Sequence, residues 1–279
     1  MTSVFHPSPS PKRLVILAQF DPQGGLPEHV RIHLDRLGDV ATKRVLVSNS
    51  PMSKAAHVAA DKVAEKVIVR PNIGWDFAAW RDAIAEEDMN DWDRVILTNS
   101  SIVGPLFPLR PIIEKQEAKG DNVWGMVLSH QHRKHLQSYF LAFDKTVFQS
   151  DVWNEWWSSV EDLSDKDEVI QRYELGFTQW LETAGFSISA LAPDLKLPWS
   201  LRFFNQNRGE GFLKGLPTFL IRDARKANRS VEFSDELIRG GMPYLKASLL
   251  WGGDTIFLKS IDSIKSIDSV EFPWPEIGL

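Results

Sequence analysis

Polar residues follow two predicted β-strands of the chain, at positions where α/β proteins hold ligands. One group lies at the end of the apolar run 66–70, and the other lies directly after the apolar run 94–98. The loops beyond the carboxyl ends of parallel strands meet at one edge of a sheet. We therefore expect both groups to line a single site: Arg70, Asn72, Gly74, Trp75 and Asp76 from the first group, and Asn99, Ser100 and Ser101 from the second.

Asp76 and the segment 99–101 each have a structural alternative to ligand binding. Asp76 starts a predicted helix, where a carboxylate caps the helix and complements its dipole. It could equally accept a hydrogen bond from a sugar or nucleotide hydroxyl, and the two roles are compatible. Asn99 and Ser101 could form a polar turn before Gly104. Their place at a strand end favours contact with a ribose or a diphosphate.

Short apolar runs alternate with helical patterns along the chain. This alternation predicts an α/β fold with a mostly parallel, Rossmann-like sheet flanked by helices. We expect strands at 12–20, 44–48, 66–70, 94–98, 123–129, 137–143 and 187–191, and helices at 75–86, 147–160, 166–184, 217–228, 234–240 and 244–250. No linker separates two domains, so we expect a disordered Pro/Ser-rich tail at 1–11 and a single domain at 12–279 with a helical C-terminal part.

Composition excludes several functional classes. The net charge of −5 gives no footprint for nucleic acid. The absence of cysteine excludes disulfides, thiol catalysis and cysteine-bound zinc. The chain has no Gly-x-Gly-x-x-Gly, no phosphate-binding loop and no Gly-x-Ser-x-Gly, which argues against dinucleotide oxidoreductases, P-loop NTPases and α/β-hydrolases. No apolar run approaches ~18 residues and the N-terminus has no signal-peptide pattern, so we expect a cytoplasmic protein.

Histidines and tryptophans give two weaker signals. His130, His132 and His135 have a spacing that could hold a metal, but a solvated basic loop is favoured for this segment. Tryptophan rings can stack on sugars. For Trp75 and Trp124 we favour plain packing.

Six segments, in order, are similar to motifs of one bacterial family. They are Asn72-Ile-Gly-Trp-Asp-Phe, Thr98-Asn-Ser-Ser-Ile-Val-Gly-Pro, Trp124-Gly, His135-Leu-Gln-Ser-Tyr-Phe, Tyr173-Glu-Leu-Gly-Phe-Thr-Gln and Pro243-Tyr-Leu-Lys. From about residue 14 to about residue 250, the chain resembles the rhamnan synthesis protein F family, which acts in bacterial cell-wall and O-antigen polysaccharide assembly. The resemblance implies a GT-A-type glycosyltransferase fold, with a nucleotide-sugar half at about 12–130 and an acceptor half at about 131–279.

The same resemblance suggests roles for residues farther along the chain. Glu174 becomes the candidate general base that removes a proton from the acceptor hydroxyl, and Asp76 is the second candidate. The alternative for Glu174 is an ordinary surface carboxylate of a helix. Lys246 becomes a candidate contact for the donor diphosphate. The acceptor side would be lined by Trp124, His135 and Gln137.

One departure from the GT-A pattern concerns a metal cofactor. GT-A enzymes commonly have Asp-x-Asp after the fourth strand, and this triplet binds a divalent ion that bridges the diphosphate. Here the triplet is Asn99-Ser100-Ser101, without a carboxylate. Mg²⁺ prefers charged oxygen ligands. Dependence on Mg²⁺ or Mn²⁺ is therefore in question, and cationic side chains or backbone N–H groups could meet the charge instead.

The resemblance thus implies an inverting glycosyltransferase, with dTDP-L-rhamnose as the expected donor. The expected acceptor is a bacterial cell-surface polysaccharide, an O-antigen or a lipid-linked glycan. Such an acceptor would imply peripheral association with the inner face of the membrane or with a transferase complex, although no basic amphipathic helix indicates it. Three alternatives stay open: a UDP- or GDP-sugar donor, a non-catalytic carbohydrate-binding or scaffold protein, and, with least support, a sugar- or phosphate-ester hydrolase.

Overall fold

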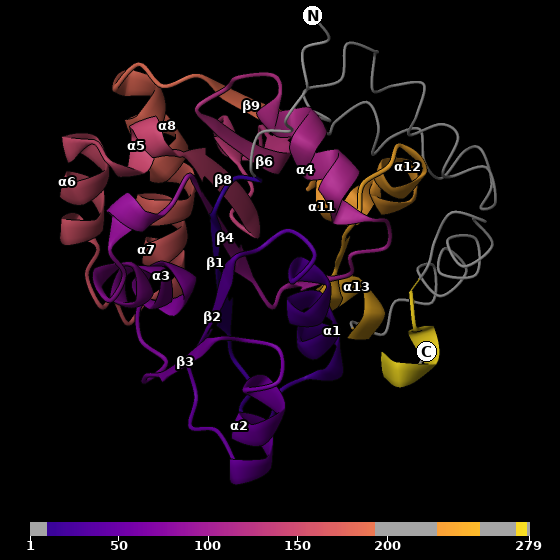
Figure 1. Ribbon diagram of the computed structural model, residues 1–279. Helices are drawn as coiled ribbons and strands as arrows, with labels where there is room; N and C mark the ends of the chain where they lie inside the picture. Colours follow the sequence, from indigo (N-terminus) through magenta and orange to yellow (C-terminus); the bar gives the residue numbers. More distant parts are fainter. Residues whose placement is uncertain (1–9, 193–227, 252–271, 278–279) are drawn as a thin grey trace, which may run out of the picture.

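An eight-stranded sheet with helices on both faces forms the centre of the molecule (Figure 1). The computed structural model describes residues 10–192, 228–251 and 272–277. Its strands run in the order β3-β2-β1-β4-β8-β6-β7, and β9 also pairs with β6. Their bounds are β1 Arg13–Gln19, β2 Lys43–Ser48, β3 Lys66–Val69, β4 Arg94–Asn99, β6 Val123–Ser129, β7 His135–Leu136, β8 Phe140–Asp144 and β9 Ile188–Ala192.

The α/β, mostly parallel sheet predicted from the sequence is confirmed. Strands β1 to β4 are parallel to one another, and β6 is parallel to β9. Strand β8 is antiparallel to both of its neighbours. The strand expected at 137–143 begins later, as β8 at Phe140–Asp144, and the short strand β7 at His135–Leu136 precedes it. No crossover helix separates β6, β7 and β8, so these consecutive strands turn back on one another.

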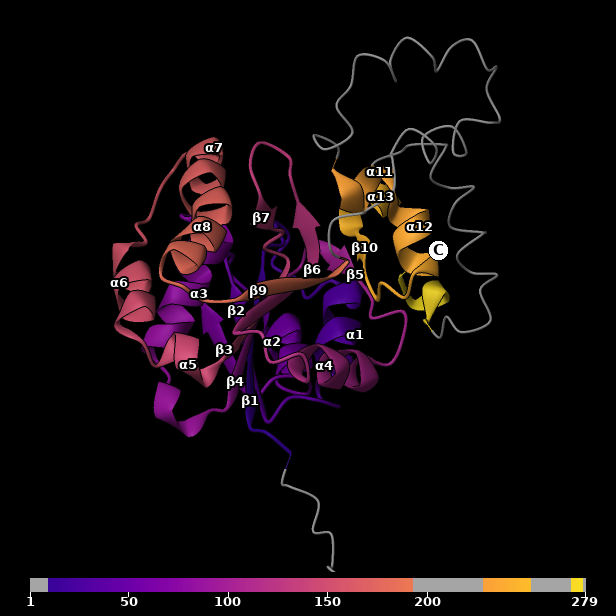
Figure 2. The same ribbon diagram turned by 90° about the horizontal axis from the view of Figure 1, so that it is seen from above.

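Helices cover the two faces of the sheet in two groups (Figure 2). Helices α1 and α4 lie on one face, and α3, α6 and α8 lie on the other. The bounds are α1 Glu28–Leu37, α2 Lys54–Ala60, α3 Trp75–Ala85, α4 Leu109–Glu117, α5 Lys145–Phe148, α6 Asp151–Ser159, α7 Lys166–Val169, α8 Leu175–Thr183, α11 Arg229–Glu232, α12 Ser234–Arg239 and α13 Ala247–Trp251, with shorter helical turns η1 Met89–Asp91, η2 Ile170–Glu174 and η4 Trp274–Ile277.

Most helix predictions are confirmed, with one interruption. The helix expected at 147–160 is split into α5 and α6, because the Ser150 hydroxyl accepts a hydrogen bond from the backbone N–H of Trp153 and starts a new helix. The helical stretch 166–184 is present as α7, η2 and α8. Almost all of the helix predicted at 217–228 and most of the tail at 1–11 lie outside the described residues. The division of the chain into one domain and two halves stays a prediction.

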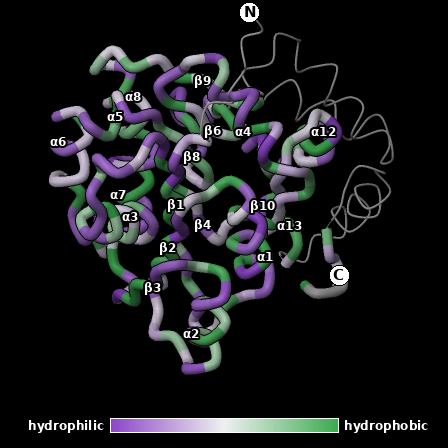
Figure 3. The backbone as a smooth tube through the Cα atoms, in the orientation of Figure 1, coloured by the Kyte–Doolittle hydropathy of each residue, from purple (hydrophilic) through white to green (hydrophobic). Residues whose placement is uncertain are grey.

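Strand β1 divides the core into two layers, one on each face. Leu14 and Ile16 pack with Trp80 of α3, whereas Val15 and Leu17 pack on the other face with the helix α1. The side chains of a strand alternate between faces, so a run of consecutive apolar residues is buried on both. Along the chain, hydrophobic stretches alternate with hydrophilic ones, as expected of elements with one buried side (Figure 3).

An aromatic layer accounts for several of the eleven tryptophans. Trp153 and Trp156 of α6 pack against Phe177 of α8, with ring centroids 6.4 and 4.7 Å apart. Trp124 is 2% exposed and packs on Phe140 at 5.5 Å. These rings belong to the core, so Trp124 is not placed to stack on a sugar.

A two-stranded antiparallel sheet joins the loop after β4 to a distant segment. It consists of β5 (Ile102–Val103) and β10 (Leu245–Lys246). The helix expected over 244–250 is therefore wrong in its first half, and α13 begins only at Ala247. β5 supplies the partner strand for β10, which a local sequence pattern does not reveal. The helix expected at 234–240 is present as α12.

Candidate active site

A cavity of about 470 Å³ lies at the carboxyl end of β4, beside α7 and α8. The sequence-predicted residues that line it are Trp75, Asp76, Asn99, Ser101, His135, Gln137, Glu174 and Lys246. His132, from the histidine segment, also lines it, and the rest of the lining comes from residues that sequence reasoning did not single out: Phe77, Gln131, Ser138, Lys166, Val169, Ile170, Leu175 and Asn228. The residues of the first group come from elements as distant in sequence as β4 and β10. The pairing of β5 with β10 brings these residues together.

Five predicted residues lie outside the lining of this cavity: Arg70, Asn72, Gly74, Ser100 and Trp124. Arg70 is buried, and its guanidinium donates to the carboxylate of Asp82 at 2.7 Å and to the carbonyl of Ile73 at 2.7 Å. It also donates to Asp162 at 3.0 Å. Arg70 therefore holds the turn that precedes α3, and its donors are already occupied.

The turn before α3 uses two consecutive residues in the left-handed region. Gly74 has φ 71° and Trp75 has φ 47°. A Cβ on Gly74 would lie 2.5 Å from the Cβ of Ala78, so this position requires glycine. A left-handed tryptophan is strained by ~1–2 kcal/mol, and such strain is concentrated at functional sites. The turn brings the next residue, Asp76, to the cavity.

The Asp76 carboxylate is bound to the end of β4. Its Oδ2 accepts a hydrogen bond from Asn99 Nδ2 at 2.8 Å. The Asn99 Oδ1 in turn accepts from the backbone N–H of Ser101 at 3.0 Å and from its hydroxyl. Desolvation in the cavity raises the pKa of Asp76 to about 6, and the nearby charge of Glu174 adds to this rise, while the hydrogen bond from Asn99 opposes it. The two predicted groups therefore meet in one hydrogen-bonded unit.

Glu174 faces this unit from the opposite helix, at an irregular turn. Residues Ile170–Glu174 form a π-helical segment between α7 and α8. Single π turns inside helices recur at functional sites because they redirect a side chain. The Glu174 Oε1 accepts from the Ser138 hydroxyl at 3.0 Å, which fixes the carboxylate in the cavity. Its other oxygen can still accept a proton.

The His135 imidazole is held as a neutral ring with a defined tautomer. Its Nδ1 lies 2.8 Å from the carbonyl oxygen of Arg133. A carbonyl can only accept, so Nδ1 carries the proton and Nε2 keeps its lone pair. Burial lowers the pKa of His135, although the hydrogen bond to Arg133 and the charge of Glu174 oppose this. His135 can therefore accept a hydrogen bond from a ligand hydroxyl.

Two lysines supply positive charge to the cavity. Lys246 Nζ lies 3.3 Å from the Ser101 hydroxyl and 4.4 Å from the ring centroid of Tyr139. Burial lowers the pKa of Lys246, and the charges of Glu174 and Asp76 oppose this effect. Lys166 begins α7 and is exposed. Lys166 is the first residue of the helix predicted at 166–184, and nothing in the sequence indicated that it would line a site.

The lining does not fit a divalent metal. Within the described parts of the chain, no group of three or more His, Asp or Glu side chains is placed to hold an ion. The Asn99 carbonyl oxygen, the most suitable neutral ligand of the triplet, is turned back onto Ser101. Mg²⁺ and Mn²⁺ prefer several oxygen ligands, carboxylates among them. The histidine segment likewise forms no metal cluster, although His132 and His135 line the cavity.

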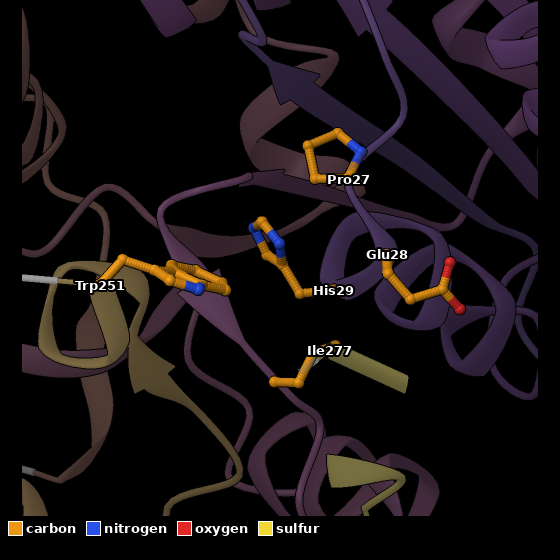
Figure 4. A pocket seen from close by; sticks show the side chains of 5 residues that line it. All are labelled: Pro27, Glu28, His29, Trp251 and Ile277. Atoms are coloured by element: carbon orange, nitrogen blue, oxygen red, sulfur yellow. The ribbon is translucent and has the colours of Figure 1, made fainter. Parts of the chain in front are cut away.

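A second, smaller pocket of about 340 Å³ is lined by Pro27, Glu28, His29, Trp251 and Ile277 (Figure 4). The His29 Nε2 donates to the carbonyl of Ser100 at 3.1 Å, and the imidazole lies 4.9 Å from the indole of Trp251. Burial lowers the pKa of His29. Ser100 therefore contacts α1 with its backbone and does not line the larger cavity.

Comparison with known families places the chain. The family model described as rhamnan synthesis protein F matches residues 44–198, which is more than half of the 279 residues. The chain belongs to this family. The resemblance inferred from the six motifs is thereby confirmed, and the matched region contains Asp76, Asn99 and Glu174.

Two curated relatives are longer than the part of each that this chain matches. An uncharacterized protein, y4gN, of Sinorhizobium fredii is 26% identical over 188 residues, covering 65% of this chain and 49% of that protein. The virulence protein VirA of Vibrio anguillarum is 25% identical over 197 residues, covering 68% of this chain and 63% of that protein. This chain therefore spans from about half to less than two thirds of the length of these relatives.

Among solved structures, glucosyl-3-phosphoglycerate synthase from Mycobacterium tuberculosis, in complex with Mn²⁺ and uridine-diphosphate-glucose, is similar at a TM-score of 0.35 and 13% identity. The similarity covers 50% of this chain and 58% of that enzyme.

In the described residues of the present chain, no helix is long and apolar enough to cross a membrane.

Proposed function

We propose that this chain transfers a sugar from a nucleotide sugar to a glycan in the cavity at the end of β4. One observation supports this above all: the family-matched region brings two carboxylates from different elements, Asp76 and Glu174, to one polar cavity. A cavity of about 470 Å³ is within the range of small-molecule sites. Carboxylates with separate hydrogen-bond partners can take separate roles, one in binding and one in proton transfer.

The donor would lie across the Asp76–Asn99 unit. Asp76 accepts a hydrogen bond from Asn99 and has a second oxygen for a sugar or ribose hydroxyl. Ser101 and Lys246 lie next to this unit, where the diphosphate would bind. Arg70 and Gly74 act indirectly by shaping the turn. Asn72 is exposed on the same turn.

The acceptor would bind between Glu174 and the neutral His135. In the proposed reaction Glu174 takes the proton of the acceptor hydroxyl, the hydroxyl oxygen bonds to the anomeric carbon, and the bond to the nucleoside diphosphate breaks. Gln137 orients this side, because its amide donates to Asn228 at 3.0 Å and accepts from Ser230. Asp76 is the second candidate for the base.

The family description names rhamnan, so dTDP-L-rhamnose is the first donor to test. The transfer would then invert the anomeric centre, from a β-L-linked donor to an α-L-linked product. The acceptor would be a growing cell-surface polysaccharide, an O-antigen or a lipid-linked glycan at the cytoplasmic face of the membrane.

The proposal is tested by donor screening for nucleotide release. The purified chain is incubated with dTDP-L-rhamnose, UDP-glucose or GDP-mannose and with glycan acceptors. A Glu174→Gln variant should lose ~10²–10⁴-fold in kcat with one of these donors, because the amide cannot accept the proton. Its Oε1 can still accept from Ser138, so the fold should be unchanged. Glu155→Gln, on the exposed side of α6, is the matched control.

A non-catalytic carbohydrate-binding protein is the second candidate. The absence of a carboxylate from the triplet at Asn99 favours it, since the oxygen that could hold a metal is bound within the loop. Glycan binding without binding of any nucleotide would support this candidate and would contradict transfer. Equal turnover by the Glu174→Gln and Glu155→Gln variants would exclude Glu174 as the base.

A further inference from the structure

A bound nucleoside diphosphate would bring negative charge into the cavity, and a metal ion normally neutralises this charge. A nucleoside diphosphate carries two or more negative charges, and its departure needs positive charge beside the leaving oxygens. The position where a divalent ion would bind offers Asn99, Ser100 and Ser101, of which Asn99 is already engaged with Asp76 and Ser101. A cation must therefore come from elsewhere in the cavity.

Lys246 is held against this same loop by backbone hydrogen bonds. It pairs with Ile102 in the β5–β10 sheet, and the N–H of Ala247 donates to the carbonyl of Ser101 at 2.8 Å. These contacts fix the backbone on both sides of the lysine. Its Nζ reaches back over the loop to 3.3 Å from the Ser101 hydroxyl. The ammonium thus stands beside the triplet that would otherwise hold a metal.

Lys246 lacks the carboxylate partner that other lysines of the protein have. Lys43 lies 2.7 Å from Glu87, and Lys66 lies 2.9 Å from Glu86. Lys246 forms no ion pair with any described residue, and its contacts are the Ser101 hydroxyl and the face of Tyr139. Burying an unpaired ammonium is unfavourable. A bound anionic ligand would supply the missing partner of the Lys246 ammonium.

We propose that Lys246 replaces the divalent ion of the GT-A site, so that the donor diphosphate binds to its ammonium without metal. This inference rests on the proposed function and deepens it. Lys166, at the start of α7, also lines the cavity but is exposed. It would add screened charge only.

The test measures binding of dTDP, UDP and GDP by isothermal titration calorimetry, once in EDTA and once in Mg²⁺ or Mn²⁺. The variants are Lys246→Met, which keeps the aliphatic stem, and Lys115→Met, an exposed lysine of α4, as the control. We expect one nucleotide to bind the native chain in EDTA, with a Kd that metal changes by less than about threefold. Loss of a charged hydrogen bond should weaken binding to Lys246→Met by at least ~10-fold.

The melting temperature of the ligand-free variants gives a second readout. Lys246→Met should melt at the same temperature as the native chain or higher, because it removes an unpaired buried charge. A lysine with a purely structural role would give a lower melting temperature instead. If the methionine variant does not fold, the metal response of the native chain still decides the question.

Each failure has a distinct signature. Binding to the native chain only in the presence of metal would overturn the replacement of the metal and leave the proposed function intact. Equal binding by Lys246→Met and Lys115→Met in EDTA would exclude Lys246 as the diphosphate partner. If none of the three nucleotides binds under any condition, the proposed function fails, and this inference fails with it.

Discussion

Asp76→Asn is expected to stabilise the ligand-free protein at neutral pH while it impairs the site. The native carboxyl has its pKa raised to about 6 by desolvation, and it accepts a hydrogen bond from Asn99. An asparagine at this position has nearly the same shape, and its Oδ1 can accept the same hydrogen bond from Asn99. The substitution therefore removes the ionisation and keeps the contact.

The sign and size of the effect follow from the pKa. Because the folded-state pKa of Asp76 is higher than the ordinary aspartate value of 3.8, its stabilising contribution is complete below pH 3.8 and is lost as the pH rises through about 6. A shift of this size corresponds to at most ~3 kcal/mol of unfolding free energy at pH 7.5. The side chain is partly exposed, so we expect ~1–3 kcal/mol. The amide variant does not ionise and keeps this stability.

Urea denaturation of both proteins at pH 4.5, 6.0 and 7.5 measures the effect. The difference in unfolding free energy between Asp76→Asn and the native chain should increase from pH 4.5 to pH 7.5. Titrating groups far from Asp76 are shared by the two proteins, so their contributions cancel. Asp35→Asn, on the exposed side of α1, is the control variant in the same measurement. A constant difference for Asp76→Asn, or a variant less stable than the native chain at pH 7.5, would refute the assigned desolvation.

Two further substitutions test the elements that position the site. Gly74→Ala should destabilise the protein by ~2 kcal/mol or more, because the new Cβ would meet Ala78 at 2.5 Å in a left-handed turn. The control is Gly120→Ala, because Gly120 has φ 78° and no atom within 4 Å of an added Cβ. This variant should lose only ~1 kcal/mol of unfolding free energy in the same urea titration. Equal losses for the two variants would show that the contact with Ala78 is unimportant. Trp80→Phe should lose ~2–4 kcal/mol, because the indole N–H that donates to the Thr98 carbonyl at 3.0 Å disappears from a fully buried site. Thermal or urea unfolding measures this loss, and a value below ~1 kcal/mol would contradict it.

The sequence predicts the edge of the site well because strand ends and turns are local features. The runs before Asn72 and Asn99 have the apolar character of buried strands, and the parallel order of β1 to β4 places their ends at the same edge of the sheet. Gly74 likewise indicates a left-handed turn. These features depend on a few neighbouring residues and on the general geometry of α/β sheets.

The remaining parts of the site depend on contacts between distant segments, which local patterns do not encode. The π turn at Glu174 changes the direction of its side chain within an otherwise regular helical pattern. Arg70 has a side chain suited to binding an anionic ligand, but its guanidinium already donates to Asp82 and Asp162. Lys246 lies within a predicted helix, but in the structure it belongs to β10, which pairs with β5. In each case a partner far away in the sequence decides the outcome.

The pairing of β5 with β10 has a consequence for biosynthesis. Lys246 and Ser101 meet across a sequence separation of 145 residues, and a ribosome adds ~5–20 residues per second. The strands β1 to β4 can emerge and associate well before the segment that carries this lysine leaves the exit tunnel. The nascent chain would therefore hold a formed sheet with an unfinished cavity for several seconds. In the proposed function, substrate capture would begin only after the segment that carries β10 has left the exit tunnel.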